Sequence, residues 1–454
     1  MQHIISDLEA LRAGDLPTHG GKTLAYVYDS GLAEVDALGV QALTMFSSAN
    51  GLDPTAFPSL LAMEKYLVGF AKELFHAPDT AVGSVTSGGT ESILLAVQTA
   101  RDAHPEIDRP AMILPTTIHA AFHKAAHYYG VERIMVDVDP ATRKASVPAM
   151  QAALEAHGDR VVLMAASTPS YAHGVIDPIE ELAALAHARG VRFHVDACIG
   201  GWVLPFTERV TVPWDFAVKG VTSLSADLHK YAYTPKGVSL LLHRDPELRK
   251  PQFFASADWP GYTMLNATTQ STKSGGPLAA AYAVVKHLGR TGYTELTDRT
   301  LVGVDQLVAG LEKIEHISLA APPESSLIAL ETDGNCDVFT ISDLMLDRGW
   351  YVQPQMAFGD MPASIHLTVC AATADHIGDF LTAFSEAVDA AVAAGPIEIP
   401  EDLAAAAQAI DPATLNDEAF DGLLALAGLG GEGGEVSAPD RMAPVNALLN
   451  IAPP

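Results

Sequence analysis

The stretch from Val221 to Gly237, VTSLSADLHKYAYTPKG, places Lys230 between a histidine and a tyrosine, after a run of small hydroxylated residues. Most lysines are solvated surface charges, so the lysine taken alone predicts little. The apolar run GVSLLLH at 237–243 follows and is predicted to be a strand. The surroundings of Lys230 therefore decide how this stretch is interpreted.

Around this stretch, from about Ala81 to Leu242, short apolar runs alternate with longer Ala-rich amphipathic runs. The alternation is typical of an α/β fold with a mostly parallel sheet. Further predicted strands are RVVLMAAS at 160–167 and VRFHVDA at 191–197, and predicted helices are ESILLAVQTARDA at 91–103 and PIEELAALAHARG at 178–190. The last helix closes with Gly190, where a left-handed cap is expected.

The pattern of apolar and polar residues changes near residue 290, towards the end of a predicted long helix at 275–293. A smaller α+β region is expected beyond it. Its predicted elements are the strands HISLAA at 316–321, SSLIALE at 325–331 and SIHLTVC at 364–370, and a helix at 373–394.

The tail contains a Pro-rich joint at 395–402, an alanine helix, and the run GLGGEGGE at 428–435, which is predicted to be flexible. The predicted organisation is an N-terminal arm at 1–50, a large domain at 51–289, a small domain at 290–394 and a C-terminal extension at 395–454.

Composition excludes several classes of protein. The 454 residues are 48% hydrophobic, which is enough for a large core. Lys and Arg number 27 against 55 Asp and Glu, and the formal charge of -28 disfavours nucleic acid and anionic membrane surfaces as partners. The three cysteines show no paired spacing, and neither a signal peptide nor a membrane span is recognised. We expect a soluble cytoplasmic protein.

The first chemical motif is TSGGTES, from Thr86 to Ser92, directly before a predicted helix. Paired glycines and the free N–H groups of a helix start can cradle a phosphate, although such a turn more often has a purely structural role. It differs from a nucleotide P-loop. The tempting GGKT at 20–23 would need a glycine at position 16, where the chain has Leu16.

The second motif is Asp196, at the carboxyl end of a predicted strand, where open α/β sheets bind ligands and where turn aspartates are also common. The third is the series His119, His123 and His127, spaced four apart and expected on one face of a helix. No HExxH pattern accompanies the series, so a metal site is disfavoured. We expect His119 to enter the site and the other two histidines to be structural.

The order of these groups along the chain indicates pyridoxal phosphate. Its aldehyde needs a lysine for a Schiff base, its phosphate needs N–H donors, and its ring nitrogen needs a carboxylate. An imidazole can stack on the ring. Lys230 is thus predicted to form the imine, with His229 and Ser225 helping to hold the phosphate.

These residues resemble the pyridoxal-phosphate lyases of the sphingosine-1-phosphate lyase type, relatives of the glutamate and aromatic amino-acid decarboxylases in the group II decarboxylase family. The matching strings are TSGGTESILLAVQTARD, HAAFHKAAHYYG, HVDACIGGWVLPF and SLSADLHKYAYTPKG, over roughly residues 22–290. The tail APDRMAPVNALLN resembles that family's C-terminal helix. The resemblance implies a type I, aspartate aminotransferase-like fold and an obligate homodimer with each active site at the subunit boundary.

The resemblance also implies roles for individual residues. Lys230 would be the imine lysine, Asp196 the partner of the ring nitrogen, His119 the stacking imidazole, Gly88, Gly89 and Thr90 the phosphate cradle, and Ser167 or Thr168 the neighbour of the 3-hydroxyl. Lys236, six positions after Lys230, and Tyr28 would serve the substrate and its proton transfers. The alternative for Lys236 is a surface lysine.

Two positions depart from the family pattern. Asp53 stands where a histidine associated with the substrate's phosphate is usual, and an anion there should repel a phosphorylated substrate. Lys273 stands where the family has an arginine, which keeps the charge but loses the bidentate fork.

The favoured function is retro-aldol cleavage of a small 2-amino-3-hydroxy substrate, possibly phosphorylated, to an aldehyde and an amine. Amino-acid decarboxylation is the alternative, because the cofactor groups are the same for both reactions. A non-catalytic relative that kept the fold is a third hypothesis, which the joint presence of lysine, aspartate and histidine disfavours.

Overall fold

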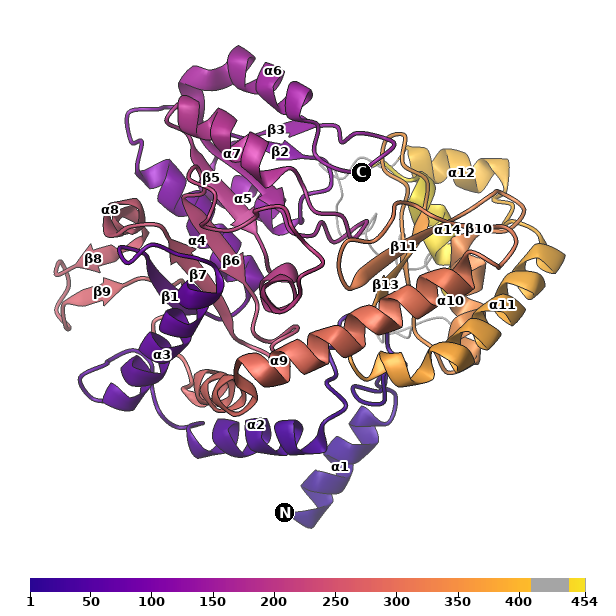
Figure 1. The fold of residues 1–454 in the computed structure, drawn as a ribbon, viewed down its shortest axis with the longest axis horizontal. Helices are drawn as coiled ribbons and strands as arrows, with labels where there is room; N and C mark the ends of the chain where they lie inside the picture. Colours follow the sequence, from indigo (N-terminus) through magenta and orange to yellow (C-terminus); the bar gives the residue numbers. More distant parts are fainter. Residues whose placement is uncertain (410–440, 454) are drawn as a thin grey trace. The chain divides into compact units, whose positions relative to one another are not determined.

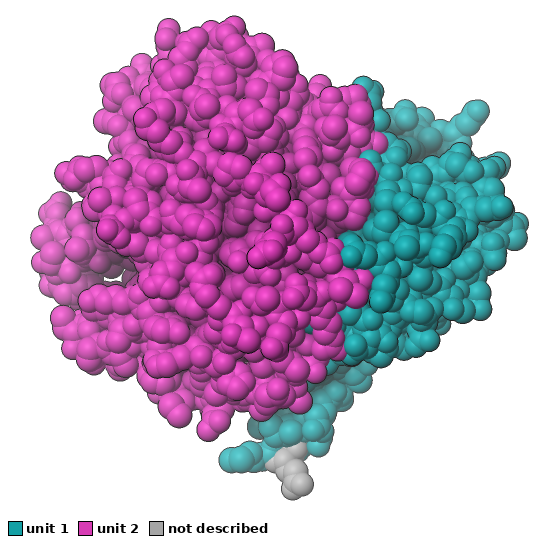
Figure 2. All heavy atoms as spheres, in the orientation of Figure 1, with its two compact units in different colours: residues 1–27, 303–320, 328–454 teal, residues 28–302, 321–327 magenta. Residues whose placement is uncertain are grey.

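The computed structural model describes residues 1–409 and 441–453 (Figure 1). The chain forms two compact units (Figure 2). The larger unit comprises residues 28–302 and 321–327, and the smaller comprises residues 1–27, 303–320 and 328–454.

The larger unit is built on a seven-stranded sheet with the strand order β1-β7-β6-β5-β4-β2-β3. The strands are β1 Val82–Thr86, β2 Ala111–Pro115, β3 Glu132–Val136, β4 Val161–Ser167, β5 Arg192–Asp196, β6 Ser223–Ala226 and β7 Ser239–His243. β7 runs antiparallel to both of its neighbours, and the ladders from β3 through β6 are parallel. The predicted mostly parallel sheet is confirmed. Every residue of β4 and β7 is buried, as expected for strands covered on both faces.

The helices of this unit are α2 Ala33–Met45, α3 Pro58–Leu74, α4 Gly89–Asp102, α5 Ala121–Tyr129, α6 Val147–His157, α7 Ile179–Ala188 and α8 Pro246–Arg249, with the start of α9 Gly276–Leu311. A hairpin of β8 Phe254–Ser256 and β9 Met264–Asn266 follows α8. Short 3₁₀ turns are η1 Gly158–Arg160, η2 Gly200–Trp202, η3 Leu204–Phe206 and η4 Lys250–Gln252.

Local sequence explains where several helices begin and end. The Ser146 hydroxyl accepts the N–H of Ala149 at the start of α6. Gly190 follows α7 with φ +68°, which confirms the predicted left-handed residue. The predicted helix at 275–293 belongs to α9, which is interrupted at Gly289 by φ +56° and ψ -166°. Only glycine adopts that conformation at little cost.

α4 is buried along most of its length. Its Ile93 and Val97 pack with Phe122 of α5 and with Met112 and Leu114 of β2. Each such buried side chain contributes roughly 2 kcal/mol relative to exposure. The N-terminus of α4 is therefore held rigidly against the sheet.

The smaller unit combines a four-stranded sheet, in the order β10-β11-β13-β12, with helices. Its elements are α1 Gln2–Arg12, β10 Ile317–Leu319, β11 Leu327–Thr332, α10 Val338–Asp347, β12 Gln353–Gln355, β13 Ser364–Thr368, η5 Thr373–His376, α11 Ile377–Ala394, α12 Glu401–Gln408 and α14 Ala443–Ile451. Residues 1–27 join this unit partly because the N–H of Leu24 donates to the Tyr351 carbonyl at 2.8 Å. The predicted α+β character of the C-terminal region is confirmed.

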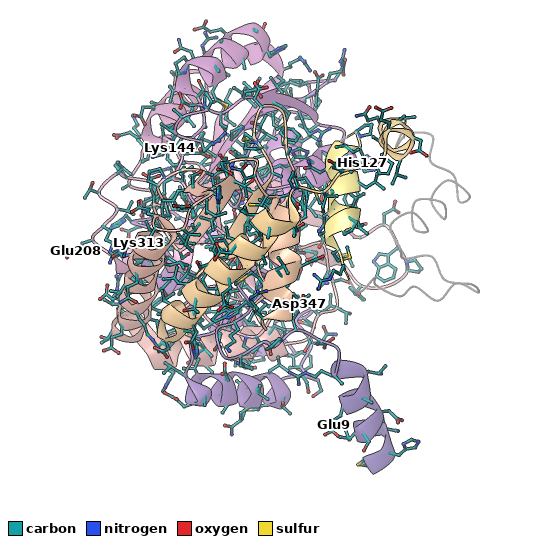
Figure 3. The ribbon with its side chains drawn as sticks, turned by 90° about the vertical axis from the view of Figure 1, so that its right-hand side faces the viewer. Glu9, His127, Lys144, Glu208, Lys313 and Asp347 are labelled. Atoms are coloured by element: carbon teal, nitrogen blue, oxygen red, sulfur yellow. The ribbon has the colours of Figure 1, made fainter. Side chains whose placement is uncertain are left out.

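The C-terminal helix predicted within 438–450 is present as α14. The Asp343 carboxylate accepts the N–H groups of Met442 and Ala443 at its start. Arg441 pairs at 2.6 Å with Asp347, which is labelled in Figure 3. The predicted alanine helix corresponds to α12. The run predicted to be flexible, 428–435, lies outside the described residues. Within residues 1–409 and 441–453, the helices all fall short of the length and apolarity that a bilayer crossing requires.

Candidate active site

A cavity of about 370 Å³, called here the first cavity, lies in the larger unit, at the carboxyl ends of β4, β5 and β6 and beside the start of α4. The predicted site residues that line it are Gly88, Gly89, Thr90, His119, Ser167, Asp196, His229 and Lys230. The carboxyl edge of an open α/β sheet is where ligands bind. The fold thus brings together groups that lie far apart in the sequence.

The predicted phosphate cradle forms the turn between β1 and α4. The first amides of a helix have no partner within it and carry positive partial charge, so they suit an anion. A Cβ atom on Gly89 would lie 2.7 and 2.8 Å from the Asp227 carboxylate oxygens and 2.8 Å from Cys198 Sγ. Only glycine permits this close approach.

Asp196 and His119 line the same cavity. Asp196 ends β5, is 6% exposed, and its Oδ1 accepts the N–H of Cys198 at 3.1 Å. Burial lowers the pKa of His119, and the Asp196 carboxylate offsets this only in part. His119 Nδ1 accepts the N–H of Ala121 at 3.1 Å, which assigns the ring proton to Nε2. A neutral imidazole and a carboxylate therefore face one cavity.

The histidine series differs from its prediction. α5 begins at Ala121, so His119 precedes the helix and does not share a helical face with His123 and His127. The N-cap of α5 is Ala120, and the His119 ring accepts the N–H of Ala121 from outside the helix. His123 Nδ1 instead lies 2.6 Å from Arg133. His119 does line the cavity, as predicted.

Lys230 is held by a carboxylate that the sequence interpretation did not single out. Its Nζ lies 3.0 Å from Asp227 Oδ2, and the two side chains are 19% and 2% exposed. Burial opposes the charge of Lys230, but the Asp227 carboxylate outweighs it, so the pKa of the lysine is raised. The pKa of Asp227 is lowered despite its burial, because Lys230 and His229 lie beside it.

His229 lines the cavity next to the cradle. Its Nε2 lies 3.7 Å from Asp227 Oδ2, and its Nδ1 accepts the N–H of Val238 at 3.3 Å. Burial lowers the pKa of His229. The side chain is thus fixed between the Lys230 loop and β7.

Four predicted residues do not line the cavity: Ser225, Thr168, Lys236 and Tyr28. Ser225 is fully buried, and its hydroxyl contacts His194 Nε2 at 3.1 Å and Cys198 Sγ at 3.3 Å. Thr168 is also fully buried, and only its neighbour Ser167 lines the cavity. Lys236 Nζ donates to the His229 carbonyl at 3.3 Å and lies 4.8 Å from the centre of the Tyr28 ring. Tyr28 and Lys236 thus lie together.

Lys273 lies elsewhere, in a second cavity of about 500 Å³ in the same unit. Asp53 and Arg249 also line this second cavity, and Ser87 lines both cavities. Asp53 accepts the N–H and hydroxyl of Thr55 at 2.8 and 2.6 Å, and these bonds lower its pKa. Lys273 forms no ion pair within residues 1–409 and 441–453.

Comparison with known proteins supports the chemistry of the first cavity. Residues 1–332 match the description "Pyridoxal-dependent decarboxylase conserved domain". The chain belongs to the pyridoxal-dependent decarboxylase family. Residues 401–454 match "Pyridoxal-dependent enzyme, C-terminal putative HTH domain".

Within this family the chain is similar to sphingosine-1-phosphate lyases. It is 37% identical to sphingosine-1-phosphate lyase 1 of Rattus norvegicus over 81% of this chain and 64% of that one. It is 35% identical to the Oryza sativa lyase over 87% of this chain and 74% of that one. The chain thus spans less than two thirds of the rat protein.

Solved structures agree with this placement. A sphingosine-1-phosphate lyase from Burkholderia pseudomallei matches with a TM-score of 0.80 and 31% identity over 87% of this chain and 91% of that one. A Lactobacillus brevis glutamate decarboxylase matches with a TM-score of 0.76 and 21% identity over 87% of this chain and 93% of that one, and that likeness concerns the fold alone. The predicted type I fold is confirmed.

The residues of this family member fit pyridoxal phosphate, the cofactor that the family match confirms. Gly89 leaves the α4 amides open to a close ligand, and Asp227 Oδ1 is buried without a hydrogen-bond partner among the described residues. Lys230, Asp196 and His119 supply an amine, a carboxylate and a flat ring around the same space. This donor set matches what the cofactor requires.

Sequence reasoning missed Asp227, Glu91, Tyr171 and Cys198, which also line the first cavity. Asp227 could have been found from its spacing, because it stands three residues before Lys230 and directly follows β6. Glu91 lies within TSGGTES but reads as an ordinary first-turn acid. Burial and the nearby Asp196 and Asp227 raise the pKa of Cys198, so its thiol stays neutral.

Proposed function

We propose that the protein is a pyridoxal-phosphate-dependent carbon–carbon lyase. It cleaves a 2-amino-3-hydroxy substrate to an aldehyde and an amine, as the sphingosine-1-phosphate lyases to which it is similar suggest. One observation supports this most directly: Lys230, Asp196, His119 and the start of α4 line a single cavity.

The cofactor, when bound, supplies an aldehyde that can be held by an amine and a ring that accepts an electron pair. The chain's own groups have separate tasks. Amides of Gly88, Gly89 and Thr90 would hold its phosphate, and Asp196 would keep its ring nitrogen protonated. Lys230 supplies the amine.

His119 is suited to stack on the ring because its lowered pKa keeps it neutral near pH 7. A neutral ring adds no positive charge that would compete with the protonated pyridine. Ser167 lines the cavity, and the family resemblance suggests that it would neighbour the ring hydroxyl.

Tyr28 and Lys236 are proposed to serve the substrate's protons. Retro-aldol cleavage requires removal of the proton from the 3-hydroxyl, breakage of the Cα–Cβ bond with departure of the aldehyde, and return of a proton to Cα. Lys236 Nζ lies 4.8 Å from the centre of the Tyr28 ring, so an amine and a phenol are neighbours that can be assigned to these proton transfers.

The substrate's phosphate is the point on which this chain departs from its relatives. Asp53 is ionised and held by Thr55, so it opposes a second anion at its position. We therefore propose a substrate with little or no phosphate near Asp53. Amino-acid decarboxylation stays the second candidate, because the family is named for it and the cofactor groups do not separate the two reactions.

We further propose a homodimer in the cytoplasm, organised as arm, large domain, small domain and extension, that binds no nucleic acid. The first cavity carries the carboxylates of Glu91, Asp196 and Asp227 against the ammonium of Lys230. A phosphate dianion entering this negative space is better held if another cation joins it. Within its own chain Lys273 lines the second cavity and not the first. We therefore propose that Lys273 of a second copy supplies this cation.

The test begins with purified protein and pyridoxal phosphate. Bound cofactor should absorb in the visible or near-ultraviolet range, and borohydride should trap it on the peptide that contains Lys230. Lys230→Ala should abolish trapping, and Lys219→Ala, an exposed lysine of the same unit, should retain it. Trapping that survives in Lys230→Ala would refute the lysine assignment.

Substrate class is then assayed with sphingoid-base phosphates, free sphingoid bases, 3-hydroxy amino acids and ordinary amino acids. Aldehyde without CO2 supports the lyase, and CO2 without aldehyde supports the decarboxylase. The oligomeric state is measured in the same preparation by sedimentation, and a fully active monomer contradicts the proposed dimer.

A further inference from the structure

Glu91 is a buried carboxylate that the proposed chemistry does not use. It lies in the first turn of α4, is 6% exposed, and lines the first cavity. Burial opposes its charge, but hydrogen bonds from Ser87 and Thr269 outweigh this and lower its pKa. An ionised group has thus been retained beside an anion-binding turn, where it should weaken phosphate binding unless it has another role.

The two oxygens of Glu91 contact different parts of the chain. Oε2 accepts the N–H of Ser87 at 2.6 Å, which alone would be an ordinary helix-capping contact. Oε1 accepts the N–H of Thr269 at 2.7 Å and also its hydroxyl. Thr269 is 178 residues away in the sequence. A helix cap does not require that second contact.

The segment that Glu91 reaches, residues 266–273, forms a wall of the second cavity. Thr268, Gln270 and Lys273 all line that cavity. The segment is braced internally, because Asn266 Oδ1 accepts the N–H of Thr268 at 3.0 Å. Gln252 anchors it separately through the Ala267 carbonyl at 2.6 Å. Glu91 therefore links the 266–273 segment to the phosphate cradle. Because Asn266 and Gln252 also hold the segment, its fold should survive without Glu91.

Resting on the proposed function, we infer that Glu91 is a positioning residue that couples the two cavities. It joins Ser87, which lines both cavities, to Thr269 and the segment that carries Lys273. Binding of an anion at the cradle fixes Ser87–Thr90, and through Glu91 it stabilises residues 266–273. By reciprocity, an ordered 266–273 segment strengthens anion binding at the cradle.

Glu91→Gln is the decisive variant because it keeps the shape but leaves one acceptor oxygen. The amide nitrogen cannot accept an N–H, so the side chain can accept the backbone N–H of Ser87 or that of Thr269 but not both. Thr269→Val is the second variant, made from the opposite side, and it removes only the hydroxyl arm. Glu106→Gln is the control, since Glu106 is exposed and contacts only His104 among the interactions described.

Hydrogen exchange of the peptide covering 262–273 is the readout, with the full-length protein alone, with pyridoxal phosphate, and with inorganic phosphate. In the wild type both phosphates should slow exchange. In Glu91→Gln exchange should be about tenfold faster, since losing a charged hydrogen bond is worth at least that factor, and the phosphates should no longer change it. Thr269→Val should fall between, and Glu106→Gln should match the wild type.

Two outcomes overturn the inference. In the first, hydrogen exchange of residues 262–273 is equal with and without cofactor, although absorbance shows that the cofactor is bound. That result would leave the proposed function intact. The other is a Glu91→Gln protein that binds inorganic phosphate more tightly with unchanged exchange, since Glu91 would then be only a local charge. If pyridoxal phosphate does not bind at all, the proposed function fails, and the inorganic phosphate arm still decides the coupling.

Discussion

Replacing Asp227 by asparagine tests the electrostatics assigned to Lys230. The carboxylate oxygen and the ammonium nitrogen are 3.0 Å apart, and the Asp227 side chain is 2% exposed. Two unit charges at that separation attract by about 5.5 kcal/mol at an effective dielectric constant of ~20. That attraction is several times the 1.36 kcal/mol that corresponds to one pKa unit, so the carboxylate can hold the pKa of Lys230 above its ordinary value despite burial.

Without the carboxylate, burial is no longer opposed and should lower the pKa of Lys230 below its ordinary value of 10.5. We expect a total fall of at least about two units. The assay is competitive reductive methylation of the cofactor-free protein between pH 7 and 11, with the Lys230 peptide quantified by mass spectrometry. Lys230 should label faster in Asp227→Asn than in the wild type across this range.

The same variant should lose stability in a defined pH window. The raised pKa of Lys230 stabilises the fold below its unfolded pKa, and the lowered pKa of Asp227 stabilises it above its own unfolded pKa. The difference from wild type should therefore be greatest between about pH 4 and pH 10. Breaking a buried pair costs roughly 3–5 kcal/mol.

Asp215→Asn is the matched control, since Asp215 is also buried but pairs with His76 at 2.7 Å. It should lose stability without changing the labelling of Lys230. If the labelling profile of Lys230 in Asp227→Asn superimposes on that of the wild type, the pair does not set the charge of Lys230.

Three further outcomes are expected. Gly89→Ala should weaken cofactor binding at least tenfold, because the added Cβ meets Asp227 and Cys198. In the control Gly69→Ala, in α3, the added Cβ meets nothing within 4 Å, and the protein should gain up to about 1 kcal/mol of stability. Equal cofactor affinities of the two variants would contradict the assignment of the phosphate cradle. Urea unfolding should show lower stability at pH 5 than at pH 6.5, by at least about 2 kcal/mol. Burial lowers the pKa of His173 and His194 to about 4 and of His243 to about 3, so at pH 5 the unfolded chain takes up protons that the folded chain does not. Asp177, whose pKa is raised by burial to about 6, acts in the opposite direction. A stability that does not change between pH 5 and pH 6.5 counts against these assignments. Phe384→Ala should lower the free energy of unfolding by about 3–5 kcal/mol, because the ring is fully buried and stacks on Phe380 at 5.5 Å. Leu346→Ala should lower it by less than about 0.5 kcal/mol, because Leu346 is exposed. Similar losses of stability for both variants would refute the packing argument.

Three of the seven strands of the larger sheet were predicted, because they are short apolar runs bounded by turn residues. β4, β5 and β7 all lie within the predicted runs. The position of β7 between β1 and β6, antiparallel to both, was not predictable, because pairing depends on contacts between distant segments. The helical face predicted for His119 was wrong because α5 begins only at Ala121, and the spacing of the histidines does not reveal where the helix starts.

The site shows the same division. Gly88, Gly89, Asp196 and Lys230 were predictable, since each stands at a recognisable end of a strand or start of a helix. Ser225 looked equally suitable from its position near Lys230. In the structure its hydroxyl is taken by His194 and Cys198, so it supports the cavity from behind.

The sequence by itself determined which chemical groups this protein carries and at which ends of its elements they stand, because periodicity, glycine and charge act locally along the chain. Tertiary structure alone decided which of those groups share a cavity and which are neutralised. The pairing of Asp227 with Lys230, the enclosure of Ser225 and the contact from Glu91 to Thr269 all depend on side-chain packing. Such packing follows from how strands and helices meet in space, and linear spacing does not encode that directly.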